Sequence, residues 1–89
     1  MPTISFTPVL RRFLTAPAAQ VEAETVSGAL AIVFTAHPAL RSYVLDDQGT
    51  LRRHVAIYVN GRPVSDRQRL SDLVGARDEI YVFQALSGG

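Results

Sequence analysis

The residues best placed to do chemistry in this sequence are the last three, Ser87, Gly88 and Gly89, which follow a strand-like segment. Glycine has no Cβ, so consecutive glycines give a backbone that is poorly ordered but thin enough to enter a narrow channel. A free α-carboxyl group has a pKa of roughly 3.5 and is ionised at neutral pH. We therefore expect residues 1–86 to form one domain and residues 87–89 to leave it as a flexible tail that delivers the Gly89 carboxylate to a partner.

Side-chain chemistry is not expected elsewhere in the chain. The absence of cysteine excludes disulfides, thiol catalysis and thiolate metal sites. The two histidines, His37 and His54, lack the spacing of a metal-binding pair, so no metal site is predicted. Neither a Gly-x-Ser-x-Gly motif nor a Gly-x-x-x-x-Gly-Lys loop occurs. The sequence thus predicts a protein with no catalytic residue and no cofactor of its own.

Composition supports one small globular domain, with 89 residues of which 47% are hydrophobic and 19% charged. The net charge of +1 and the short Arg11-Arg12 and Arg52-Arg53 doublets give no basic stripe for nucleic acid. No apolar run is long enough for a bilayer and no leader opens the chain, so we expect a cytoplasmic protein without a membrane partner.

All nine basic residues are arginine, and lysine is absent. A base composition that favours Arg and Ala codons is the simpler explanation, and a functional reason is compatible with it. The functional reason is that a chain with an activated C-terminus benefits from lacking amines that could attack it.

The first half of the chain predicts two strands and a helix. Residues 3–7 and 20–24 alternate polar and apolar residues and suggest an antiparallel hairpin. Thr25 is a plausible N-cap for an amphipathic helix. The apolar face of that helix comprises Val26, Ala29, Leu30, Val33 and Phe34. Gly28 either allows close packing on the sheet or is simply tolerated, and Pro38 can open a second short helix.

The second half predicts three more strands. Residues 54–59 form the clearest one, Asn60-Gly61 indicates a type I′ turn, and 62–64 would return along an edge because of Pro63. Leu70 and Leu73 are expected to plug the core from an irregular crossover. The final strand is apolar on both faces, which suits a central position, with Ile80 and Val82 facing inward.

A partner-binding surface follows from this alternation. If Ile80 and Val82 face the helix, then Tyr58, Tyr81 and Phe83 lie with Ala56 on the opposite face of the sheet. Aromatic residues scattered on a surface are common. Here, however, the aromatic residues run directly into the tail, and exposed apolar patches of this kind mark protein docking sites.

The order of elements, the approach to the last strand and the terminal Ser87-Gly88-Gly89 resemble the β-grasp sulfur carriers. That family includes the molybdopterin synthase small subunit, the thiamine sulfur carrier and cysteine-type carriers. The resemblance implies an α+β, ubiquitin-like fold: a mixed sheet of four to five strands with one main helix across one face. Segments 37–41, 51–55 and 57–61 look closest to the cysteine-type branch. Ala76-Arg77 departs from the Asp-Gly common at this place and leaves the local turn open.

The resemblance implies a carrier rather than an enzyme. A ubiquitin-activating-type adenylyltransferase would bind the sheet face, thread the tail towards ATP and adenylate Gly89. A sulfur donor such as a sulfurtransferase would convert the adenylate to a thiocarboxylate for a downstream synthase. Phe83, Arg11 and Arg12 would contact the partner, although the two arginines fit a solvated loop nearly as well.

Two other interpretations remain open at this point. The first is a ubiquitin-like modifier conjugated through Gly89 to lysines of other proteins, which needs the same tail and the same adenylation. The second is an interaction module in which the terminal glycines are incidental.

Overall fold

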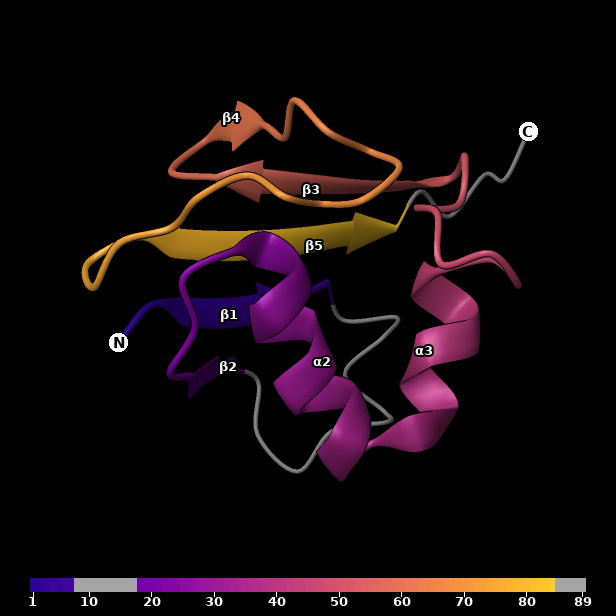
Figure 1. Ribbon diagram of the computed structural model, residues 1–89, viewed down its shortest axis with the longest axis horizontal. Coiled ribbons are helices and arrows are strands. Elements are labelled where there is room, and N and C mark those ends of the chain that lie inside the picture. Colours follow the sequence, from indigo (N-terminus) through magenta and orange to yellow (C-terminus); the bar gives the residue numbers. More distant parts are fainter. Residues whose placement is uncertain (8–17, 85–89) are drawn as a thin grey trace.

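The computed structural model describes residues 1–7 and 18–84, and this part of the chain forms one mixed sheet with helices packed on one face (Figure 1). The elements in chain order are β1 (Thr3–Phe6), β2 (Ala18–Gln20), α2 (Val26–Ala36), α3 (Pro38–Val44), β3 (Val55–Val59), β4 (Arg62–Pro63) and β5 (Glu79–Gln84). The strands lie in the order β2-β1-β5-β3-β4. The predicted α+β, β-grasp architecture is confirmed.

The last strand lies at the centre of the sheet, as its two apolar faces predicted. β5 runs parallel to β1 and antiparallel to β3, with Ile80 paired to Ile4 on one side and to Val59 on the other. A strand hydrogen-bonded on both edges has no free ladder positions. β5 is therefore a fixed base for whatever follows it in the chain.

The hairpin between β3 and β4 forms at Asn60-Gly61. Both residues adopt positive φ, 53° at Asn60 and 82° at Gly61, as a type I′ turn requires. Pro63 sits in β4 at the edge of the sheet, where its missing N–H costs no ladder bond. The predicted turn and edge strand are both confirmed.

α2 begins and packs as its sequence predicts. The Thr25 side chain accepts a hydrogen bond of 3.0 Å from the Gly28 N–H, and all five residues of the predicted apolar face are buried. A Cβ at Gly28 would meet Thr25 Oγ1 at 3.2 Å and Ala23 Cβ at 3.6 Å. Gly28 thus lies against the helix cap, and close packing on the sheet is not the reason for it.

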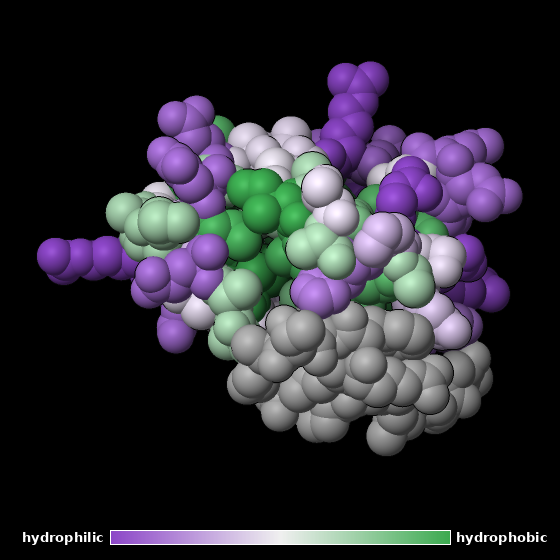
Figure 2. All heavy atoms as spheres, turned by 90° about the horizontal axis from the view of Figure 1, so that it is seen from below, coloured by the Kyte–Doolittle hydropathy of each residue, from purple (hydrophilic) through white to green (hydrophobic). Residues whose placement is uncertain are grey.

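α3 follows immediately, because His37 ends α2 and Pro38 opens the next helix. Its Leu40 and Val44 are fully buried. Figure 1 shows α2 lying across the sheet with α3 beside α2, and Leu40 and Val44 of α3 belong to the same core cluster as the buried face of α2. In the view from below, hydrophobic side chains gather in the middle and hydrophilic ones surround them (Figure 2).

The second strand lies earlier than predicted. β2 covers Ala18–Gln20, whereas the alternation had placed a strand over residues 20–24. The Val21 N–H donates to the Pro2 carbonyl at 3.0 Å, and proline has no N–H to continue the ladder. Val21, which follows β2, is nevertheless buried, and Ala23 packs against the core.

The prediction that Leu73 plugs the core is wrong, because its side chain is 81% exposed. Leu70 and Val74 are the buried apolar residues of this crossover. The Asp72 carboxylate accepts hydrogen bonds from the Ser65 and Asp66 N–H groups, both at 2.9 Å. Side chains alternate along an extended backbone, so turning Asp72 and Val74 inward directs Leu73 to solvent.

The turn that leads into β5 forms without the glycine that is common at this place in the β-grasp sulfur carriers. The Asp78 N–H donates to the Gly75 carbonyl at 3.1 Å, and the Asp78 carboxylate accepts from the Gly75 N–H at 2.7 Å. Ala76 and Arg77 are not among the residues with positive φ. Asn60 adds a further bond by donating its side-chain amide to the Asp78 carboxylate at 2.8 Å.

Candidate partner-binding face and tail exit

The predicted docking residues lie on adjacent strands. Tyr58 of β3 is paired with Tyr81 of β5, and Ala56 with Phe83. Their neighbours in each strand alternate with them and enter the core shared with α2. The four side chains therefore share the sheet face opposite α2, as predicted.

Exposure on this face is greatest towards the end of β5. Tyr58, Tyr81 and Ala56 are half-buried, whereas Phe83 is 42% exposed. A large apolar side chain held open on a central strand is costly to leave in water, and a protein partner can cover it. Phe83 is thus the most accessible of the predicted docking residues in the described chain.

The base of the tail is well fixed. The Gln84 N–H donates to Thr7 Oγ1 at 3.3 Å, and the Thr7 N–H donates to the Val82 carbonyl at 3.0 Å. The predicted tail residues Ser87, Gly88 and Gly89 lie outside the described residues. So do Arg11 and Arg12, and the predictions for all five stay predictions.

A basic cluster at this end of the sheet was not singled out from the sequence as a site. Arg52, Arg53, His54 and Arg67 line one shallow depression with Leu51 and Asp46. Because Val55 is paired with Gln84, this cluster lies beside the end of β5. The Arg52-Arg53 doublet in the sequence could have indicated a basic cluster, but its position beside the end of β5 follows only from the pairing of β3 with β5.

No cluster of three or more His, Asp or Glu side chains suited to a metal lies within residues 1–7 and 18–84. The pKa of Asp78 is lowered by the Gly75 N–H and the Asn60 amide, and that of Asp66 mainly by the Arg69 N–H and the Ser71 hydroxyl. Both carboxylates thus act as turn caps.

In the same part of the chain no helix is long and apolar enough to cross a bilayer.

Comparison with known proteins decides the family. A model of the ThiS family matches residues 12–89. The chain belongs to the ThiS family. Small carriers of this family are non-catalytic, so the chain is a ThiS-type sulfur carrier or ubiquitin-like modifier and not an enzyme. The resemblance to the β-grasp sulfur carriers is thereby confirmed.

Individual relatives agree with this assignment. The chain is 38% identical to small archaeal modifier protein 1 of Haloferax volcanii over 65 residues, which cover 73% of this chain and 70% of that protein. A crystal structure of the Haloferax volcanii protein matches with a TM-score of 0.83 at 30% identity, covering 99% of this chain and 98% of the other.

The same fold occurs in a chain of the Amycolatopsis orientalis BexX/CysO complex. It matches with a TM-score of 0.86 at 22% identity over 100% of both chains. At that identity the match shows a shared fold. In that crystal structure CysO and BexX form a complex with each other.

Proposed function

We propose that this ThiS-family chain carries sulfur on the carboxylate of Gly89. An activating enzyme binds the sheet face and brings the carboxylate to ATP. The carboxylate oxygen attacks the α-phosphate, pyrophosphate leaves, and an acyl-adenylate forms. A sulfide-level nucleophile supplied by a sulfur donor then attacks the acyl carbon and AMP leaves. The product is a thiocarboxylate that a downstream synthase consumes.

The observation that carries this proposal is the arrangement of β5. Residues of the strand alternate between the core and the opposite face, and Gln84 at its end leads into the tail. A partner seated over Tyr58, Tyr81 and Phe83 is therefore already next to the tail base. Docking and delivery need no movement within the described fold, which lowers the entropic cost of positioning the reacting group.

The separate roles follow from this arrangement. Tyr58, Tyr81 and Phe83 supply apolar contact, and Arg11 and Arg12 supply charge to the same partner. Ser87 and Gly88 pass through the channel, and Gly89 reacts. ATP is a substrate of the activating enzyme and is not bound by this chain alone.

The proposed destination of the sulfur is cysteine or a related sulfur metabolite. Its support is the likeness of segments 37–41, 51–55 and 57–61 to cysteine-type carriers. Molybdopterin and thiamine synthesis use the same tail chemistry and remain the other destinations to test. A purified acceptor enzyme from each pathway, supplied with the thiocarboxylate form, distinguishes them by which one releases the free carboxylate.

The alternative function is that of a protein modifier, and the identity to small archaeal modifier protein 1 favours it. The activated Gly89 would then be attacked by a lysine amine of another protein. The chain has no lysine, so a conjugate could not be extended through lysines of this protein.

Expression of the tagged chain in cells separates the two functions. A carrier gives a thiocarboxylate and no larger species, whereas a modifier gives higher-mass conjugates that resist reduction. Deletion of Gly89 provides the control, since it removes either product. Conjugates without any thiocarboxylate would contradict the carrier function.

A further inference from the structure

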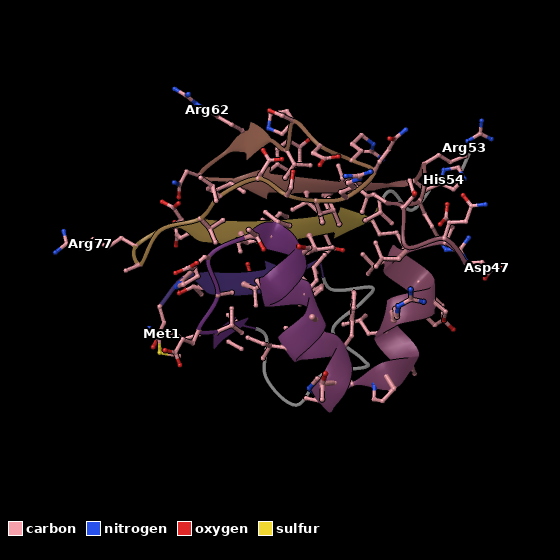
Figure 3. All side chains as sticks on the ribbon, in the orientation of Figure 1. Met1, Asp47, Arg53, His54, Arg62 and Arg77 are labelled. Carbon is pink, nitrogen blue, oxygen red and sulfur yellow. The ribbon has the colours of Figure 1, made fainter. Side chains whose placement is uncertain are left out.

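The sheet end at which β5 finishes carries a group of basic side chains. Arg53 and His54 immediately precede Val55, whose partner across the ladder is Gln84. Paired residues on antiparallel strands have Cα atoms about 5 Å apart. Figure 3 shows Arg53 and His54 at this end of the sheet and Arg62 and Arg77 at the opposite end.

Hydrogen bonds fix the backbone that carries these side chains. Arg67 Nη2 donates to the carbonyl oxygens of Arg52 at 3.0 Å and of Val55 at 2.8 Å. Arg52 Nε donates to the Ser42 carbonyl at 2.7 Å, and the Val55 N–H donates to the Arg52 carbonyl at 3.0 Å. The turn is thus held from both sides while the Arg53 side chain stays exposed.

Asp46 and Asp47 also lie at this end of the molecule. Asp46 lines the same depression, and its Oδ1 accepts hydrogen bonds from the Gln48 and Thr50 N–H groups at 2.9 and 3.0 Å. Asp47 follows it in the same turn and points outward at this end (Figure 3). The arginines outnumber these carboxylates at the depression, so the surface beside Gln84 is basic.

The length of the tail restricts where a partner can sit. Gly89 lies five residues beyond Gln84, and a fully extended chain of five residues spans about 17 Å. An enzyme that takes Gly89 into its active site must therefore open within that distance of Gln84. Arg53 and His54 directly precede the residue paired with Gln84, so they lie well inside that distance.

We propose that Arg52, Arg53 and His54 form a basic rim that binds carboxylates surrounding the entrance of the enzyme that receives the tail. The inference rests on the proposed function. Complementary charges at the edge of an interface steer diffusional encounter and fix the register of docking. The rim thus selects partners with an acidic entrance, and Phe83 then supplies the apolar contact.

The test compares two charge reversals. Arg53→Glu changes the rim, and Arg62→Glu makes the same charge change at the opposite end of the sheet. A ubiquitin-activating-type adenylyltransferase is assayed with each protein by ATP–pyrophosphate exchange over a range of salt concentrations. Arg53→Lys retains the charge and serves as a rescue variant, and thermal unfolding verifies that all three variants fold.

We expect Arg53→Glu to raise the concentration of this protein that half-saturates the enzyme about tenfold at low salt, because charges at the rim act mainly on the rate of association. The difference should shrink as salt screens the charges. Arg62→Glu and Arg53→Lys should behave as the wild type. Equal half-saturating concentrations for Arg53→Glu and Arg62→Glu at every salt concentration would overturn the proposed role of the rim. Failure of the enzyme to load even the wild-type protein would instead overturn the proposed function.

Discussion

Tyr58 of β3 lies directly opposite Tyr81 of β5, on the sheet face away from α2. The same strand buries Ile80 and Val82 in the core and ends at Gln84. One central strand therefore supports the fold, presents the docking face and leads to the tail. Because its residues alternate between the two faces, substitutions can separate stability from partner binding.

The docking face is tested by Phe83→Ala, with Ile32→Ala as a matched control. The two side chains are equally open, 42% and 43% exposed, but Ile32 lies on α2. Phe83→Ala should raise the half-saturating concentration for the activating enzyme at least about tenfold, the usual effect of losing an aromatic anchor. Ile32→Ala should leave it unchanged. Similar values for the two variants would show that this face does not bind the enzyme.

The core prediction concerns Ile57, which is fully buried and paired with Val82. Ile57→Ala leaves a cavity in the centre of the sheet and should lower the free energy of unfolding by about 2–5 kcal/mol. Urea denaturation followed by circular dichroism measures this. A loss within the scatter of surface substitutions, about 0.5 kcal/mol, would contradict the assignment of Ile57 to the core.

The helix cap is tested by Thr25→Ala, which removes the acceptor for the Gly28 N–H. The free energy of unfolding should fall by about 1 kcal/mol. Thr35→Ala removes an exposed hydroxyl that donates to the Ala31 carbonyl within the same helix, so it should change stability much less. Equal losses for the two variants would argue against a cap at Thr25.

Acid should destabilise the protein through Asp78 and Asp66. Their pKa values lie below the ordinary 3.8, so each contributes stability that is complete above that value. That contribution is lost as the pH falls from about 4 through the lowered pKa of each group. Asp78→Asn should be less stable at neutral pH and lose less stability on acidification. Parallel curves of unfolding free energy against pH for both proteins would contradict the role of Asp78.

Local sequence patterns were sufficient to predict features that depend on residues within a single helix, strand or turn. The spacing of apolar residues after Thr25 predicts the buried face of α2, and Asn60-Gly61 predicts its turn because few residues tolerate positive φ. Alternation along the two strands also predicts that Tyr58, Tyr81, Ala56 and Phe83 share one face of the sheet, and the structure adds that they lie opposite one another in pairs.

Contacts between distant segments could not be predicted in this way. Leu73 has the apolar side chain of a core residue, but it is exposed because the neighbouring Asp72 turns inward to accept hydrogen bonds from the Ser65 and Asp66 N–H groups. The basic rim depends on the pairing of Val55 with Gln84, which no local pattern reveals. In both cases the outcome depends on a contact between residues that are more than five positions apart in the sequence.

The central claim is that Gly89 carries the sulfur, and intact-protein mass spectrometry tests it most directly. The protein is incubated with ATP, its activating enzyme and a sulfide donor, beside a variant that lacks Gly89. We predict that the wild-type mass rises by the difference between sulfur and oxygen, and that fragmentation places the change on Gly89. An unchanged wild-type mass while the enzyme forms the acyl-adenylate would contradict the account.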